Sequence, residues 1–269
     1  MRLPQLRRDV QTVVSQSFRI LLLALQSQSN KFAHETSIGM DKLISFKGAQ
    51  YPKSVILFAV YFYVRFPVSY RDLEEIMAER GVNLDHATLN RWVEKYAGAV
   101  ADEAHLRKVP TGQSWRMDET YVKVKGVWTY LYRAIDKQGK TLDFMLSERR
   151  DETAATAFFA KAIGNNGWPE KVVIDKSGSN TAGLFNMNCL LVMFGWCWLI
   201  TVRRTKYLNN IIEQDHRFIK KVTRPMQTFK SFSSASATLA GIEVAHMIRK
   251  GQFDGPEKSG FAQFAALAA

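Results

Sequence analysis

The chain has 269 residues, of which 46% are hydrophobic and 12% aromatic, a composition that supports a buried core and excludes a disordered protein. Its 37 Lys and Arg outnumber 25 Asp and Glu, and the resulting net charge of +12 favours a polyanionic partner. Two cysteines, Cys189 and Cys197, are too few for a disulfide framework and are typical of a reduced cytoplasmic protein.

Residues 1–45 are expected to form an N-terminal extension. They are rich in Gln, Ser and Arg and contain one short apolar run, from Ile20 to Leu25. A secretory signal peptide has about 7 to 15 apolar residues followed by a small-residue cleavage site, and this segment has neither feature. The extension is therefore given no targeting role.

One apolar helix and then a pair of helices are predicted between residues 52 and 96. The apolar helix begins at Pro52, a favourable first helical residue, and Pro67 ends it. Ser69 and Asp72 have the spacing of a capping box, and Gly81 supplies the positive φ that closes a helix. An apolar stripe at helical spacing follows, formed by Leu89, Trp92, Val93 and Tyr96.

The second of the paired helices carries polar and basic side chains opposite its apolar stripe, at Thr88, Arg91 and Lys95. Two short helices around a glycine-containing turn, with such a face on the second, are typical of a helix-turn-helix that enters a DNA groove. An ordinary helical hairpin has the same spacing and stays open as the alternative.

The period of the sequence changes from helical to strand-like after residue 112. Val, Tyr and Trp are frequent in two segments that Lys125 and Gly126 separate, which predicts a hairpin. The predicted elements are strands at 114–124, 127–135 and 141–146, a helix at 151–163, a strand at 171–175, a helix from 179, a strand within 197–202 and a helix at 209–222. Three meandering strands followed by alternating helices and strands predict a mixed-sheet α/β domain.

The most apolar segment of the chain, residues 189–200, is predicted to be buried core. It is shorter than the roughly 20 residues that cross a bilayer, so a membrane span is excluded. Large aromatic side chains are usually buried, and four tryptophans are expected in the core: Trp115, Trp128, Trp196 and Trp198.

Three carboxylates are placed where a sheet could collect them. Asp118 lies near the start of the first strand, Asp175 at the end of the fourth, and Glu213 on the helix after the fifth. If the first and fourth strands are neighbours, Asp118 and Asp175 come together. Clustered carboxylates repel unless a cation neutralises them, and hard oxygen ligands favour Mg²⁺ or Mn²⁺. Two such ions can activate a hydroxyl and stabilise the leaving oxygen of a phosphodiester.

Each of these carboxylates also has a structural interpretation. Asp175 could be a turn or capping residue after its strand, and Glu213 could be a solvated side chain paired with Arg217. Glu119 points to the opposite side of the strand from Asp118, and the pattern alone does not say which of the two faces the core. Singly, none of these residues establishes an active site.

The excess positive charge is concentrated around Glu213. Residues 201–224 hold seven Lys and Arg against two carboxylates, a net charge of +5. Glu213, then His216 or Arg217, and then Lys220 share one face of the predicted helix. His216 is rejected as a zinc ligand because no Cys or His lies at ligand spacing.

Four blocks of the sequence resemble the insertion-sequence-six family of bacterial transposases over about residues 46–252. They are SYRDLEEIMAERGVNLDHATLNRWVEKYA, MDETYVKVKGVWTYLYRAID, VVIDKSGSN with KYLNNIIEQDHRFIKK, and FKSFSSASATLAGIEVAHMIRKGQ. The resemblance implies an α/β fold, an RNase H-like mixed β-sheet with flanking helices, preceded by an all-α helix-turn-helix DNA-binding domain. It also implies a DDE triad of Asp118, Asp175 and Glu213 that holds two Mg²⁺ ions, with Mn²⁺ as a substitute.

DNA is the expected partner, as terminal inverted repeats and as target. The residues expected to contact it are His86, Thr88, Asn90, Arg91 and Lys95 on the helix-turn-helix, and Arg203, Arg204, Lys206, His216, Arg217, Lys220 and Lys221 in the basic segment. By the resemblance, Lys220 contacts DNA near the cut. Two DNA ends must meet, so we expect a homodimer or a larger assembly, in the bacterial cytoplasm at the nucleoid and away from membranes.

The expected domains are 1–45 as the extension, 46–100 as the helix-turn-helix domain, 101–112 as a linker, 113–225 as the catalytic domain, and 226–269 as a C-terminal helix and flexible tail. Proteins of the family usually begin near the position of Met40. Our hypothesis is that Met40 is the biological start and that residues 1–39 are translated from DNA near the end of the element.

The expected activity is metal-dependent strand cleavage and strand transfer on DNA, and the resemblance suggests replicative transposition through cointegrates. Two alternatives belong to other classes. A non-catalytic helix-turn-helix regulator would explain the charge but would make the three acids accidental. An RNase H-like nuclease would share the metal site but would degrade nucleic acid without joining ends.

Overall fold

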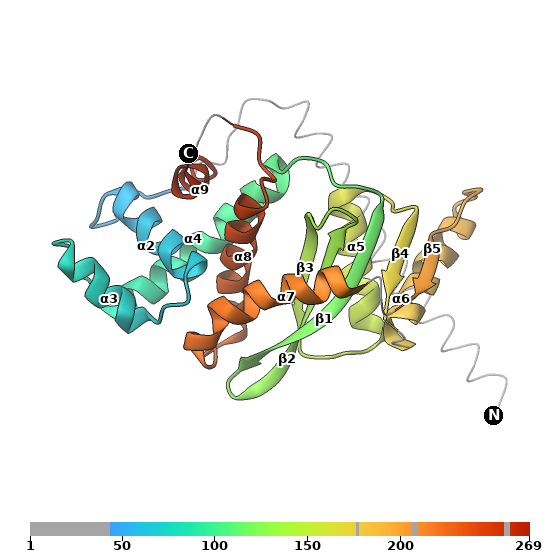
Figure 1. The fold of residues 1–269 in the computed structure, drawn as a ribbon, viewed down its shortest axis with the longest axis horizontal. Coiled ribbons are helices and arrows are strands. Elements are labelled where there is room, and N and C mark those ends of the chain that lie inside the picture. The colour runs from blue at the N-terminus through green and yellow to red at the C-terminus, as the bar shows by residue number, and fades with distance from the viewer. Residues whose placement is uncertain (1–43, 176–177, 206–208, 256–258) are drawn as a thin grey trace. The chain divides into compact units, whose positions relative to one another are not determined.

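The computed structural model of the protein describes residues 44–175, 178–205, 209–255 and 259–269. The expectations for the extension, for a start at Met40 and for Lys206 lie outside these residues. The elements in chain order are α2 (Lys53–Arg65), α3 (Tyr70–Glu79), α4 (His86–Arg107), β1 (Ser114–Val124), β2 (Val127–Asp136), β3 (Thr141–Ser147), α5 (Glu152–Asn166), β4 (Lys171–Ile174), α6 (Gly178–Met193), β5 (Thr201–Arg204), α7 (Asn210–Thr223), η2 (Arg224–Met226), α8 (Phe232–Arg249) and α9 (Gly260–Ala266) (Figure 1).

The described chain divides into two compact units, each considered by itself. The first unit contains Thr111–Thr120 and Tyr130–Ile212. The second contains residues 44–110, Tyr121–Thr129 and Glu213–Ala269. Helix α8, which the sequence suggested as an element beyond the catalytic domain, therefore belongs with the paired helices of the second unit.

The five strands form one sheet in the order β3-β2-β1-β4-β5. β2 and β3 are antiparallel, whereas β4 runs parallel to both β1 and β5. Parallel neighbours need crossover connections, and α5 and α6 supply them before and after β4. This mixed sheet with flanking helices confirms the predicted RNase H-like α/β class.

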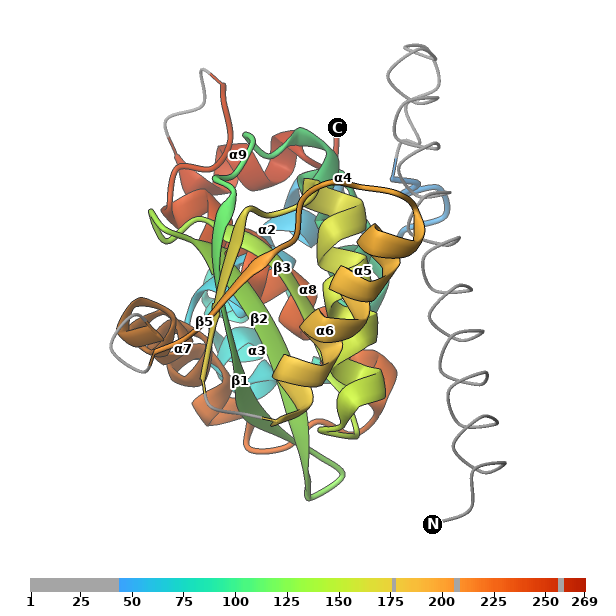
Figure 2. The ribbon, with the colours of Figure 1, turned by 90° about the vertical axis from the view of Figure 1, so that its right-hand side faces the viewer.

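Helices α5 and α6 pack against each other on one face of the sheet (Figure 2). Their core includes Phe158 of α5, which is buried with Trp115 and Met117 of β1. The two helices approach closely at Gly183, where a Cβ atom would lie 3.0 Å from the Cβ of Ala155. A larger residue at this position would push α6 away from α5.

The paired helices of the second unit begin as the sequence predicts. The Ser69 side chain accepts a hydrogen bond from the Asp72 backbone, and the Asp72 side chain accepts one from the Ser69 backbone, so the capping box is present. Gly81 has a φ of +77°, which supports the turn before α4. Two helices joined by a glycine-containing turn are therefore present, with Asp85 as the N-cap of α4, and their assignment as a helix-turn-helix stays a prediction.

Helix α4 is longer than expected, because it continues through most of the predicted linker to Arg107. Small residues along the helix are buried, among them Ala97 and Ala104. They let α8 pack along α4 (Figure 1). At the crossing, a Cβ atom on Gly241 would lie 2.7 Å from Val64 and 3.0 Å from Ala97. Small side chains here mark close helix packing rather than a flexible joint.

The predicted flexible tail contains a further helix, α9, which packs against α2 and α8. The Ser259 side chain caps it by accepting a hydrogen bond from the Ala262 backbone at 3.1 Å. Beyond the helix, Lys53 of α2 donates to the Ala268 carbonyl at 2.8 Å. The described end of the chain is thus docked on the helical unit.

The prediction that residues 189–200 are buried core is largely wrong. Helix α6 ends at Met193, and Gly195 turns the chain with a φ of +74°. The side chains that follow are exposed, including Trp196 at 51% and Trp198 at 37%. Trp128 is also exposed, at 58%, and among the four tryptophans expected in the core only Trp115 is buried. In the part of the chain that the structure describes, no helix combines the length and the apolar character that a membrane span requires.

Candidate active site

Two aspartates lie at the same level of neighbouring parallel strands. In the register of β1 and β4, Arg116 is opposite Val173. Asp118 follows Arg116 by two residues on β1, and Asp175 follows Val173 by two residues, directly after the end of β4. The expected adjacency of the first and fourth strands is thereby confirmed. The parallel direction of β1 and β4 is what brings the two acids to one place.

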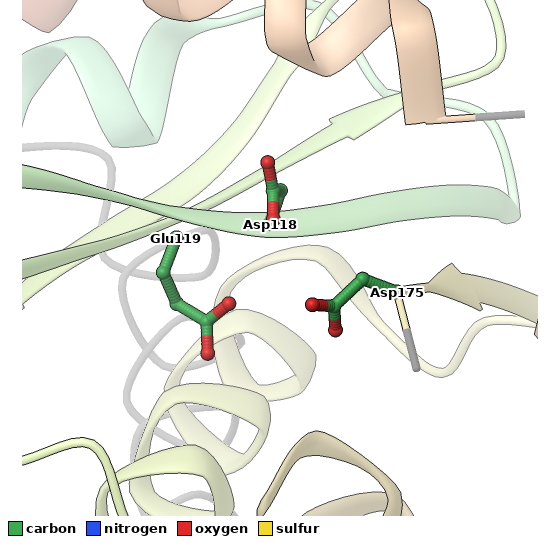
Figure 3. A group of neighbouring side chains, drawn as sticks. All are labelled: Asp118, Glu119 and Asp175. Carbon is green, nitrogen blue, oxygen red and sulfur yellow. The ribbon is translucent and has the colours of Figure 1, made fainter. Parts of the chain in front are cut away.

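A third carboxylate, Glu119, joins these aspartates. One side-chain oxygen from each of Asp118, Glu119 and Asp175 lies within 4.8 Å of the other two. In Figure 3, Glu119 and Asp175 point toward one another from β1 and from the end of β4. Three carboxylates at this separation repel one another, and hard oxygen donors are the ligands that Mg²⁺ or Mn²⁺ prefers. The donor set therefore fits a divalent cation.

Glu119 is the buried member of this cluster, whereas Asp118 and Asp175 are half-buried. Its burial answers the question that the strand pattern left open, because Glu119 shares the face of Trp115 and Met117 that packs on α5 and α6. Burial raises the pKa of Glu119 above its usual value, and nearby Arg150 partly offsets this effect.

Arg150 links two of the clustered acids. Its Nε lies 3.3 Å from Oε1 of Glu119, and its Nη2 lies 3.6 Å from Oδ2 of Asp175. Neither Glu119 nor Arg150 was predicted from the sequence as part of the site. The available signal was the pair of arginines directly before Asp151, the residue that caps α5. The Arg150 guanidinium therefore forms ion pairs with both Glu119 and Asp175.

Glu213 lies in the first turn of α7 and is exposed. It belongs to the second unit, whereas Asp118 and Asp175 belong to the first, so its position beside them stays a prediction. Arg217 and Lys220 follow Glu213 by four and seven residues, and both are exposed. The shared polar face of the helix therefore carries one acid and at least two cations.

His216 does not lie on that exposed face. Only 4% of its surface is accessible, because it follows Ile212 by four residues and precedes Ile219 by three, on the buried stripe of α7. The expected contact of His216 with DNA stays a prediction that this burial does not favour, and Arg217 is exposed at the same level of the helix. Lys221 is exposed as well.

The polar face at the start of α4 is accessible in part. His86 and Arg91 are exposed, and Asn90 is half-buried. These three residues and Lys230 line a cavity of about 360 Å³ within the second unit. The remaining residues expected to contact DNA in this region are Thr88, which accepts a hydrogen bond from Arg91 at 2.8 Å, and Lys95, which is exposed.

The basic residues of β5 are solvent-exposed. Arg203 and Arg204 end this strand, which lies at the edge of the sheet. Charged side chains on an edge strand discourage pairing with another sheet and also offer positive charge to a phosphate backbone.

A second charged cluster joins α7 to α8. Oδ1 of Asp215 lies 2.6 Å from Nε2 of His246 and 2.8 Å from Nζ of Lys250. The His246 ring also stacks on Phe218, with ring centroids 4.2 Å apart. Burial lowers the pKa of His246, and the bond to Asp215 partly opposes this shift. The cluster fixes α7 on α8.

Comparison with known proteins gives a family match that covers the catalytic region. A family model described as a DDE domain matches residues 112–252. The transposase for insertion sequence-like element IS431mec of Staphylococcus aureus strain Mu50 is 41% identical over 206 residues, which are 76% of this chain and 88% of that protein. The transposase for insertion sequence element IS257 in transposon Tn4003, also of Staphylococcus aureus, has the same identity and coverage.

Solved structures are more distant. The HTLV-2 integrase catalytic core domain in complex with magnesium (trimeric form) is 15% identical, with a TM-score of 0.38 over 51% of this chain and 86% of that one. A likeness this low says nothing of the activity of this chain.

Proposed function

The chain belongs to the insertion-sequence-six family of DDE transposases, and we propose that it cuts and joins DNA with Asp118, Asp175 and Glu213 after binding the terminal inverted repeats of its element. The observation that carries this assignment is the meeting of carboxylates from β1 and β4 within 4.8 Å. A non-catalytic regulator would have no use for such a costly arrangement of like charges.

In this proposal the three acids hold two Mg²⁺ ions, for which Mn²⁺ can substitute. When bound, these ions lower the pKa of an attacking water or hydroxyl and stabilise the leaving oxygen of the phosphodiester. Asp118 and Asp175 contribute from adjacent strands, and Glu213 contributes from α7. Arg150 acts as a positioning residue, because it orients Asp175 and neutralises the buried Glu119.

DNA is held by two groups of basic and polar residues. The helix-turn-helix reads the terminal repeats, with His86, Asn90 and Arg91 at the base edges and with Thr88 and Lys95 beside them. Exposed cations of the basic segment hold the phosphate backbone, namely Arg203, Arg204, Arg217, Lys220 and Lys221. Lys220 contacts the DNA nearest to the cut.

The reaction consists of two in-line phosphoryl transfers. Water first attacks the phosphodiester at the end of the element and releases a 3′-OH. The freed 3′-OH then attacks a phosphodiester of the target, so no covalent intermediate with the protein forms. Because two ends must be joined to one target, a homodimer or a larger assembly acts on the DNA, at the bacterial nucleoid, and cointegrates are the expected product.

A strand-transfer assay with candidate end DNA and Mg²⁺ tests the proposal. We expect single-strand cuts at the end of the element, followed by joined products on gel electrophoresis. Degradation of the DNA without joining would identify a nuclease instead. Tight binding of end DNA without any cutting would identify a regulator.

A further inference from the structure

The end of the β1–β2 hairpin is held in one conformation. Its two-residue turn has positive φ at Lys125, +51°, and at Gly126, +80°, as in a type I′ hairpin. The Lys125 backbone donates to the Phe229 carbonyl at 2.7 Å, and the Phe229 backbone donates to the Lys123 carbonyl at 2.9 Å. The Gly126 backbone also donates to the Thr228 hydroxyl at 3.1 Å. The segment after η2 thus braces the turn.

This braced hairpin presents aromatic rings to solvent. Trp128 is 58% exposed and Tyr121 is 44% exposed, and their ring centroids lie 6.5 Å apart, edge to face. The Nζ atom of Lys123 lies 4.8 Å from the centroid of Trp128. Large exposed rings on a rigid support are costly to leave in water, and such rings commonly mark a binding site.

The same rings line a pocket together with the end of α7. The pocket has a volume of about 470 Å³, within the range of about 300 to 1,000 Å³ typical of small-ligand sites. Among the described residues, its lining contains three cations, Lys123, Lys220 and Arg224, and no carboxylate. The pocket therefore combines flat apolar surface with positive charge.

We infer that this pocket binds an unpaired nucleotide of DNA, with its base stacked on Trp128 and its phosphate held by Lys123 and Lys220. Aromatic rings beside cations recognise single strands, because every base has a π-face and every nucleotide a phosphate. A base within a duplex is already stacked on its neighbours, so the exposed ring selects an unpaired one. The inference rests on the proposed function, since a cut in one strand at the end of the element removes backbone continuity and lets the nucleotides beside the cut unpair.

Binding measurements on the full chain in EDTA test this inference without cleavage. The probes are a fluorescein-labelled oligothymidylate, which forms no duplex, and a labelled duplex of mixed sequence, at fixed salt. We expect Trp128→Ala to weaken oligothymidylate binding by roughly 10-fold or more and to change duplex binding by less than about 2-fold. Trp128→Phe keeps a ring and should retain most of the affinity. Trp196→Ala, which removes another exposed tryptophan, should change neither.

The opposite results would overturn the inference. Equal weakening of both probes would make the pocket a duplex contact, and no weakening of either would remove DNA as its occupant, for instance in favour of a protein partner. If Trp128→Ala does not fold, the inference is tested by the quenching of tryptophan fluorescence on addition of oligothymidylate to the wild type and to Trp128→Phe. The wild type must then be quenched more strongly than Trp128→Phe.

This test is independent of the proposed activity. A wild-type protein that cuts and joins DNA while Trp128→Ala binds oligothymidylate normally would disprove the pocket and leave the function standing. A protein that depends on Trp128 for oligothymidylate but never joins DNA would disprove the function and leave the pocket standing.

Discussion

Strand β1 carries opposite chemistry in its two halves, and each half belongs to a different unit of the chain. In the first unit, Asp118 and Glu119 meet Asp175 in a cluster of acids with one balancing arginine. In the second unit, Tyr121 and Lys123 meet Trp128 in a cluster of rings and cations without an acid in its described lining. One strand thus places acids that fit metal ions in one unit and rings and cations that fit nucleic acid in the other.

Removing either aspartate of the acid cluster should have the largest effect. We expect Asp118→Asn or Asp175→Asn to lower the rate of strand cleavage and joining by roughly 10³-fold or more. Each variant loses a carboxylate ligand of the metal ions, and these ions stabilise the charge of the transition state by several kcal/mol. Binding of end DNA in a gel-shift assay should stay nearly intact. Asp254→Asn, at an exposed acid elsewhere, serves as the control. Full activity of either first variant would remove that residue from the triad.

Removing the arginine of the acid cluster should have a smaller effect. We expect Arg150→Ala to reduce cleavage by roughly 10- to 100-fold and to raise the Mg²⁺ concentration needed for half-maximal rate, as loss of an orienting partner does. Arg150→Lys should restore part of this loss, since it keeps the charge. The neighbouring Arg149→Ala is the matched control, and an equal loss there would contradict a specific role for Arg150.

Two glycine-to-alanine substitutions test the helical packing of the second unit without changing its charge. Gly241→Ala should lower the free energy of unfolding by about 1 to 3 kcal/mol, because the added Cβ meets Val64 and Ala97 in a filled core. Gly98→Ala in α4 has no atom within 4 Å of its new Cβ and should stabilise by up to about 1 kcal/mol. Chemical denaturation compares them. A stabilising Gly241→Ala would refute the close crossing of α8 over α4 and α2.

The buried His246 should give the smallest effect, as a pH dependence of stability. Burial lowers the pKa of His246 in the folded protein below the ordinary value of 6.5. As the pH falls through 6.5, the unfolded chain therefore binds more protons than the folded chain does. The free energy of unfolding should therefore decline as the pH drops below about 6.5 and down to the lowered folded pKa. His246→Gln should remove this decline, whereas His86→Gln, at an exposed histidine, should keep it. If the free energy of unfolding of His246→Gln still declined over this pH range, the decline would belong to other titrating groups.

Much of the fold follows from local sequence signals. The strands before and after the Lys125–Gly126 turn end within one residue of their predicted bounds, because alternation and turn residues act locally. The capping box at Ser69 is likewise a local contact. The length of α4 was underestimated, because its small residues do not reveal locally that α8 packs beside Ala97.

The candidate site was only partly predictable for a similar reason. Asp118 and Asp175 end up adjacent through strand order, which the element sequence implies. Arg150 reaches Glu119 and Asp175 from a loop, and the arginine pair before Asp151 indicates local positive charge without identifying these two partners. The exposure of Trp128 and Trp196 was missed because residue type reports a preference for burial, whereas the tertiary fold decides which side of an element is covered.

Parallel cleavage assays of Glu213→Gln and Glu119→Gln test most directly whether the third acid of the triad is Glu213 rather than the buried Glu119. We expect Glu213→Gln to abolish cleavage and joining while end DNA still binds. Glu119→Gln should keep at least roughly a tenth of the activity, since Glu119 acts through Arg150. Full activity of Glu213→Gln together with loss of activity in Glu119→Gln would instead make Glu119 the third acid.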